Sequence, residues 1–246
     1  RHGHPSADID PPRFVVFIQN HDQVGNRMRG ERLSALVDLE SCKLAAALVL
    51  LSPFTPLLFM GEEYADPAPF LYFVSHGDPE LIDAVRKGRA GEFSSFGWRA
   101  EPPDPQSEQT FARSRVTPAL RRQGPHALLW AYYRELIRLR KALPAITDPE
   151  RTGTEILPDL ERDTLVVIRR TARHAVLLLF NLADAPRDLT LPPATGAWRP
   201  LLDSAAADWG GPGVARLHFP APGDRAAITA ARRSACLFEL QAKDAP

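Results

Sequence analysis

The sequence has few cysteines, no excess of either charge and no long uninterrupted hydrophobic run. Two cysteines, Cys42 and Cys236, give neither a disulfide framework nor metal-ligand spacing, so no metal site is predicted. Each lies in an apolar stretch, which predicts two small core residues. The 30 basic and 30 acidic residues cancel over the 246-residue chain. A general nucleic-acid binder needs a basic face, so this balance argues against that class.

The longest apolar region, residues 44–60, is a poor membrane span because four residues break it: Ser52, Pro53, Thr55 and Pro56. The first residues, 1–5, lack the apolar segment of a signal peptide. We therefore expect a cytoplasmic soluble protein without nucleic-acid or membrane partners. The chain begins with Arg1 instead of methionine and soon reaches an apolar segment. We accordingly expect it to be the C-terminal part of a longer protein.

A short apolar run, residues 14–18, ends abruptly in a polar cluster of Gln19, Asn20, His21 and Asp22. Aromatic and β-branched residues in so short a run predict a strand buried on both faces, as in a parallel sheet. Polar groups just past such a strand are costly to bury without partners, and a (β/α)8 barrel places its active-site residues there. A simpler interpretation is that Asn20 and Asp22 cap the next segment and that His21 is a hydrogen-bonded loop residue.

A second apolar run, residues 57–60, leads into Glu62 and Glu63. Between the two runs, residues 39–51 have helical periodicity, with four apolar residues on one face: Leu44, Ala47, Leu48 and Leu51. Strand, helix and strand in this order are typical of a βαβ unit. The two glutamates are equally well explained as acids at a helix N-terminus, where the dipole favours them.

Downstream, helices are predicted over residues 79–89 and 125–143, the second with a wide apolar stripe. Residues 91–118 have no sustained period and predict a long surface loop pinned by aromatic side chains, of which Trp98 is also a candidate to face a ligand. Phe70, Tyr72 and Phe73 are either core residues or a wall on which a sugar stacks.

From about residue 147 the sequence changes to short strands separated by turn residues. Six are predicted, over residues 164–168, 175–180, 188–191, 198–202, 214–219 and 235–240. This spacing indicates an antiparallel sandwich.

Four segments together resemble the α-amylase family, glycoside hydrolase family 13: Gln19-Asn-His-Asp-Gln-Val-Gly-Asn-Arg27, Gly30-Glu-Arg-Leu33, Phe59-Met-Gly-Glu-Glu-Tyr64 and Pro69-Phe-Leu-Tyr-Phe73. The first is similar to the motif after the family's seventh barrel strand, and the third to the eighth. The resemblance implies an α/β plus all-β fold. Residues 1–148 would be the C-terminal part of a (β/α)8 TIM barrel, with strands 7 and 8, and residues 149–246 a β-sandwich domain.

The resemblance also implies a site. Asp22 would be the family's third acidic residue, which stabilises the transition state at the cleaved sugar, and His21 would bind hydroxyls of the same sugar. Asn20 and Arg27, also candidates for substrate binding, would mainly hold this loop. The family members most similar in these segments hydrolyse the α-1,4 bond that joins trehalose to the rest of a malto-oligosyltrehalose. They retain the anomeric configuration and need no cofactor.

This sequence departs from the family in one respect. The nucleophile and the general acid lie on strands four and five of the family's barrel, and no segment here matches either motif. Glu62 and Glu63 follow the wrong strand to replace them. We therefore expect the 246-residue chain to be inactive alone. Three alternatives remain open. They are part of another family member, such as a glycogen branching enzyme, a non-catalytic carbohydrate-binding module, and a partial barrel with no independent function.

Overall fold

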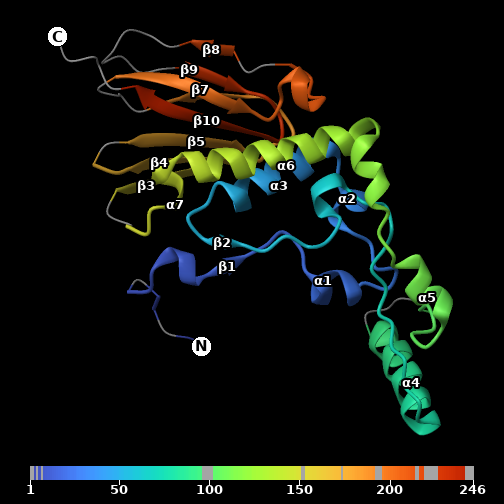
Figure 1. Ribbon diagram of the computed structural model, residues 1–246. Coiled ribbons are helices and arrows are strands. Elements are labelled where there is room, and N and C mark those ends of the chain that lie inside the picture. The colour runs from blue at the N-terminus through green and yellow to red at the C-terminus, as the bar shows by residue number, and fades with distance from the viewer. Residues whose placement is uncertain are drawn as a thin grey trace. The chain divides into compact units, whose positions relative to one another are not determined.

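The computed structural model describes residues 3, 5–6, 8–95, 102–150, 153–172, 174–191, 196–213, 216–218 and 227–241 (Figure 1). Trp98 lies outside the described residues. The chain forms two compact units. Unit 1 contains residues 1–16, 39–57 and 127–246, and unit 2 contains residues 17–38 and 58–126. These units do not test the predicted division into a barrel part, residues 1–148, and a sandwich domain, residues 149–246, which stays a prediction.

Unit 1 contains two antiparallel sheets. The larger has the strand order β3 (Thr154–Asp159), β4 (Thr164–Arg170), β5 (Ala175–Asn181), β10 (Ser234–Gln241) and β7 (Ala197–Asp203). The smaller has the order β6 (Arg187–Thr190), β9 (Ala227–Ala230) and β8 (Arg216–His218). The six predicted strands are thus confirmed. The prediction missed β3, which is mostly exposed and contains a proline, and β9, which is short and rich in alanine.

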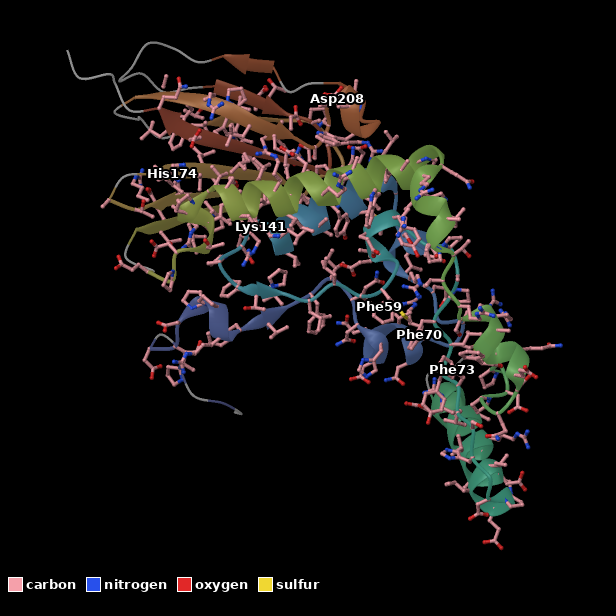
Figure 2. The ribbon with its side chains drawn as sticks, in the orientation of Figure 1. Phe59, Phe70, Phe73, Lys141, His174 and Asp208 are labelled. Carbon is pink, nitrogen blue, oxygen red and sulfur yellow. The ribbon has the colours of Figure 1, made fainter. Side chains whose placement is uncertain are left out.

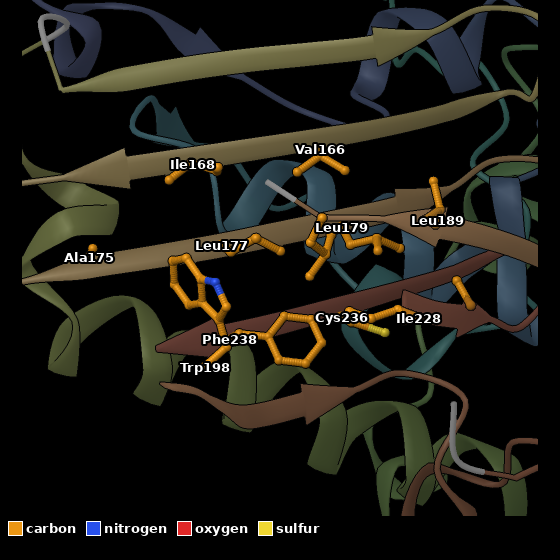
Figure 3. Packing of buried hydrophobic residues seen from close by; sticks show 12 residues of the cluster. Val166, Ile168, Ala175, Leu177, Leu179, Leu189, Trp198, Ile228, Cys236 and Phe238 are labelled. Atoms are coloured by element: carbon orange, nitrogen blue, oxygen red, sulfur yellow. The ribbon is translucent and has the colours of Figure 1, made fainter. Parts of the chain in front are cut away.

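One hydrophobic cluster joins the two sheets of unit 1 (Figure 3). Leu177 and Leu179 of β5 contribute from the larger sheet, and Leu189 and Ile228 from the smaller one. Because both sheets supply buried side chains to one cluster, they pack face to face as a sandwich. Cys236 belongs to this cluster and Cys42 is buried elsewhere, so the prediction of two small core residues is confirmed.

The larger sheet is covered on its other face as well. Helix α3 (Leu39–Leu50) contacts β10. Its Leu48, together with Leu178 and Phe180 of β5, lines a cavity of about 370 Å³. Strand β5 is therefore buried along its whole length, which explains its unbroken apolar sequence.

Helix α6 (Gly124–Ala142) confirms the predicted amphipathic helix, and its apolar stripe is buried: Leu129, Tyr132, Tyr133, Leu136 and Leu139. The short helix α7 (Pro144–Thr147) follows it and contacts β4 and β5. Arg140 of α6 donates hydrogen bonds to three carbonyls at and just past the end of α3: those of Leu50, Ser52 and Phe54. These bonds satisfy acceptors that a helix C-terminus leaves unpaired.

A parallel pair of two-residue strands, β1 (Val15–Val16) and β2 (Thr55–Pro56), also belongs to unit 1. The order β1, α3, β2 confirms the predicted βαβ unit, while the barrel stays a prediction. The expected burial on both faces of the first strand is wrong, since Val15 is 55% exposed and Phe17 37%. A sheet of two short strands covers neither of its own faces. The second strand also lies slightly earlier than its predicted range, residues 57–60.

The described elements of unit 2 are one long helix, α4 (Pro79–Ser95), and several short ones. The short ones are α1 (His21–Gly25), α2 (Leu33–Leu36), η2 (Glu62–Tyr64), α5 (Glu108–Arg113) and η3 (Pro118–Arg122). Helix α4 extends beyond its predicted end at residue 89, and α5 lies in a region predicted to be irregular. The signal for α5 is Ser107, whose hydroxyl accepts a hydrogen bond from the backbone N–H of Gln109 as an N-cap.

Within the described part of the chain, no helix combines the length and apolar character needed to cross a bilayer.

A surface ion-pair group on the larger sheet makes the stability of unit 1 depend on pH. Glu239 of β10 accepts hydrogen bonds from Arg199 and from His174, the latter with 2.6 Å between Nε2 and Oε1 (Figure 2 labels His174). These bonds lower the pKa of Glu239 below its ordinary value of 4.5. A carboxyl group whose pKa is lower in the folded state stabilises the fold above its unfolded pKa, and this contribution is lost as the pH falls.

We expect Glu239→Gln to reduce the free energy of unfolding at pH 7 and to have less effect near pH 3, where the wild-type carboxyl group is largely protonated in the unfolded state. Urea unfolding at the two pH values measures this difference. Glu155→Gln, at an exposed pair with Arg170, is the control. An equal loss at both pH values for Glu239→Gln contradicts the assignment.

Candidate functional site

The candidate site is the loop of residues 19–33 in unit 2, which follows the carboxyl end of parallel strand β1 along the chain. Asn20 begins it as the N-cap of α1, and its Oδ1 accepts a hydrogen bond from the backbone N–H of Gln23 at 2.8 Å. Asn20 therefore does what the simpler interpretation of the cluster predicted. The cap also fixes the start of the helical turn that carries His21 and Asp22.

His21 and Asp22 are neighbours on the surface. The imidazole Nε2 lies 3.3 Å from the carboxylate Oδ1, and the two side chains are 71% and 74% exposed. Asp22 is in the first turn of α1, where a negative charge is favourable. An exposed carboxylate beside an imidazole offers hydrogen-bond acceptors and a donor to a ligand that carries hydroxyl groups.

Arginines hold the remainder of the loop. Arg27, one of the predicted site residues, pairs with Glu31 through Nε and Oε2 at 3.3 Å. Arg89 of α4 donates to the carbonyl of Gly25 at 2.8 Å and to the side chain of Asn26 at 3.0 Å. Arg27 thus pairs within the loop itself, and no bond joins it to Asp22 among the described residues. Its role in substrate binding or in holding the loop stays a prediction.

The buried support of the loop was not recognised from the sequence. Arg32, which is 2% exposed, donates to the carbonyls of Ala68 at 2.6 Å and Met60 at 2.7 Å and lies over the ring of Phe59. Burial lowers the pKa of Arg32, while Asp66 and the carboxyl groups of Glu62 and Glu63 act in the opposite direction. A buried guanidinium with carboxylates around it ties the end of the loop to residues 59–68.

Asp66 organises the same region. Its carboxylate accepts hydrogen bonds from the backbone N–H groups of Ala68 at 2.8 Å and Thr117 at 2.6 Å. Burial, with Asp66 as the next cause, raises the pKa of Tyr64 to about 12. Besides burial, the raised pKa reflects the hydrogen bond between the Tyr64 hydroxyl and the Asp66 carboxylate.

Aromatic side chains in unit 2 pack edge to face in a row: Phe59, Phe70, Phe73 and Phe111 (Figure 2). These contacts agree with the interpretation of Phe70 and Phe73 as core residues. Phe111 of α5 contacts Phe73 at the end of this row and is 48% exposed. That aromatic residues pin this region to a barrel stays a prediction. Tyr72 differs, since it is 40% exposed and the guanidinium of Arg89 lies 4.5 Å above its ring.

The backbone of Gly30 lies close to that of Phe70 and Leu71. Its carbonyl accepts a hydrogen bond from the N–H of Phe70 at 2.9 Å, and its φ is +59°. A Cβ at this position would lie 2.5 Å from the carbonyl oxygen of Phe70, a backbone atom that has little freedom to move.

We expect Gly30→Ala to lower the free energy of unfolding by about 1–3 kcal/mol, because it adds backbone strain and a steric clash. Urea unfolding measures the loss. Gly88→Ala in α4, where nothing lies within 4 Å, is the control and should raise stability by up to about 1 kcal/mol. A Gly30→Ala variant as stable as the parent would show that the loop is not held at this point.

No group of three or more His, Cys, Asp and Glu side chains among the described residues is arranged to hold a metal ion.

Sequence comparison identifies relatives along most of the chain. It is 42% identical over 224 residues to the malto-oligosyltrehalose trehalohydrolase of Arthrobacter ramosus, an alignment that covers 90% of this chain and 36% of that protein. The Deinococcus radiodurans protein of the same name is 44% identical over 189 residues, covering 75% of this chain and 31% of that protein. This chain resembles a segment of malto-oligosyltrehalose trehalohydrolases. It spans about a third of the length of these curated relatives.

Two further comparisons concern the fold. The family profile described as Domain of unknown function (DUF3459) matches residues 159–231, within the sandwich of unit 1. A Salmonella typhimurium protein provisionally assigned as an α-amylase has a crystal structure similar to 94% of this chain and 36% of its own, at a TM-score of 0.72 and 31% identity. The α-amylase of H. orenii shares the fold at a TM-score of 0.56 and 17% identity, over 92% of this chain and 40% of that one. The antiparallel domain is therefore of the kind found in α-amylase-family structures. The chain as a whole is similar in sequence to trehalohydrolases.

Proposed function

We propose that this chain supplies the Asp22-bearing part of an α-amylase-family glycoside hydrolase that releases trehalose from malto-oligosyltrehalose by hydrolysing an α-1,4 bond. The observation that supports this proposal is the 42% identity to a trehalohydrolase over 90% of the chain. The exposed His21–Asp22 pair after a parallel strand agrees with it. The corresponding fold is the end of a (β/α)8 barrel followed by the sandwich.

In this proposal each site residue has a distinct role. Hydrolysis needs one carboxylic acid to protonate the leaving oxygen and a second carboxylate as nucleophile, both supplied from outside these 246 residues. Asp22 binds hydroxyls of the sugar at the cleaved bond, and this contact strengthens as the ring becomes oxocarbenium-like. His21 binds hydroxyls of the same sugar. Asn20 and Arg27 keep the loop in place. No cofactor is required.

One experiment tests both parts of the proposal. The exchange chimera is the Arthrobacter ramosus enzyme in which this chain replaces the segment that it matches. We expect the chimera to release trehalose from malto-oligosyltrehalose and the purified 246-residue chain to release none. Trehalose release by the chain alone overturns the second part, and a folded but inactive chimera overturns the first.

The same measurement separates the alternatives. A branching enzyme would form new α-1,6 links, which product analysis of the chimera detects, instead of free trehalose. A non-catalytic carbohydrate-binding module would bind malto-oligosaccharides through residues 150–246 alone. Loss of binding on removing residues 13–73 counts against that alternative.

A further inference from the structure

We propose that Glu62 is a positioning residue for Asn20, His21 and Asp22, and that it acts through the side chain of Gln19. This inference rests on the proposed function, in which Asp22 contacts the sugar. The sequence left the role of Glu62 open, with an acid at a helix N-terminus as one explanation, and the residue does lie in the first turn of η2. Its contact with Gln19 gives it a second function.

Gln19 and Glu62 form a hydrogen-bonded pair of side chains, called the clamp below. The hydrogen bonds of Gln19 determine the orientation of its amide. Its Oε1 accepts a hydrogen bond from the backbone N–H of Leu33 at 3.0 Å. A backbone N–H is only a donor, so the oxygen of the amide must face Leu33 and the NH₂ group must face the other way. That NH₂ group lies 3.4 Å from Oε2 of Glu62, which accepts from it. Gln19 thus needs an acceptor at position 62.

The clamp is buried, although the residues it holds are exposed. Gln19 and Glu62 are each 6% exposed, whereas the side chains of His21 and Asp22 are more than 70% exposed. A buried amide that loses one partner keeps an unsatisfied donor, which costs more than a surface bond does. The amide of Gln19 therefore resists rotation. The residue that follows it is Asn20, the first of the three residues that this amide positions.

Arg32 explains why a carboxylate is tolerated at this buried position. The positive charge of Arg32 and the negative charge of Glu62 interact favourably. The carbonyl bonds of Arg32 to Met60 and Ala68 fix the guanidinium on the same segment that carries Glu62. Gln19 at the start of the loop and Arg32 at its end are therefore both anchored to residues 60–68.

The clamp should affect turnover more than substrate binding. A sugar hydroxyl bonds Asp22 most strongly in the transition state, so a small displacement of the loop weakens that contact first. Misplacement of a catalytic group by about 1 Å can lower a rate about a hundredfold. The three-residue interval between Gln19 and Asp22 leaves little chain to absorb such a displacement.

In the exchange chimera we expect Glu62→Ala to lower kcat about tenfold or more, with KM changed less than about threefold. Glu62→Gln should retain most of kcat, because the glutamine Oε1 accepts the same hydrogen bond. Glu63→Ala is the matched control, since Glu63 is next in sequence, also interacts with Arg32 and makes no bond to Gln19 among the described residues. Equal losses in Glu62→Ala and Glu63→Ala, or in Glu62→Ala and Glu62→Gln, overturn the proposal.

A second measurement uses the 246-residue chain and needs no activity. Amide hydrogen exchange at Leu33 reports the bond to Gln19 Oε1. We expect Glu62→Ala to accelerate this exchange about tenfold or more, while Glu62→Gln and Glu63→Ala leave it close to the parent. Unchanged exchange in Glu62→Ala overturns the positioning role. The expected exchange result together with an inactive parent chimera locates the failure in the proposed function and not in the clamp.

Discussion

Asp22→Asn in the exchange chimera is expected to lower kcat roughly a thousandfold and to leave the melting temperature unchanged. Hydrogen bonds that strengthen toward the transition state of glycoside hydrolysis supply several kcal/mol, and each 1.36 kcal/mol is a factor of ten in rate. The amide keeps the shape of the carboxylate and loses its charge. Because the Asp22 side chain is 74% exposed and its ion-pair contact within the described part of the chain is with the equally exposed His21, the fold should not depend on it.

Steady-state kinetics on malto-oligosyltrehalose and a thermal melt of the same preparation test this expectation. Asp83→Asn is the control, an exposed aspartate of α4 whose nearest basic partner is Arg86 at 3.9 Å. It should leave both kcat and the melting temperature unchanged. Near-normal turnover in Asp22→Asn removes Asp22 from the site, and a large drop in melting temperature assigns it a structural role instead.

Lys43→Met is expected to lower the free energy of unfolding of unit 1 by about 3–5 kcal/mol, because it leaves a buried carboxylate without its partner. Lys43 is fully buried, and its Nζ lies 2.8 Å from Oε1 of Glu40. It also donates to the carbonyl of Ser204 at 2.6 Å and to that of Trp209 at 3.1 Å. The ammonium group therefore joins α3 to the segment that follows β7.

Urea unfolding of the 246-residue chain measures the loss. Lys141→Met on α6, labelled in Figure 2, is the matched control. Lys141 is exposed, and surface changes of this kind stay within about 0.5 kcal/mol. The double variant Lys43→Met with Glu40→Leu should recover part of the loss, because no buried charge then remains unpaired. If Lys43→Met and Lys141→Met unfold alike, the buried pair contributes little to stability.

Elements with a strong local signal were predictable from the sequence. The apolar stripe of α6 predicted its range to within a residue at each end, since a face buried along five turns must repeat with the helical period. The apolar run of residues 175–180 predicted strand β5, although not its burial along the whole length. Burial on both faces was expected instead for β1, whose run is equally apolar but whose described neighbour in the sheet is β2 alone.

The exposed part of the candidate site was also predictable, because Asn20, His21 and Asp22 are consecutive and their chemistry is visible in the sequence. Its buried support was not. Gln19 and Glu62 are 43 residues apart, and each alone has the composition of an ordinary loop or cap residue. Only a known pairing of the two segments would have identified the clamp.

The three carbonyls held by Arg140 have a consequence for synthesis on the ribosome. The three carbonyls precede Arg140 by 86 to 90 residues. The turn that contains Leu50, Ser52 and Phe54 therefore lacks the guanidinium of Arg140 until α6 has left the exit tunnel. The turn leads directly into β2, and contacts of such long sequence separation form late. The register of the β1–β2 pair is therefore expected to be secured only after most of unit 2 has been translated.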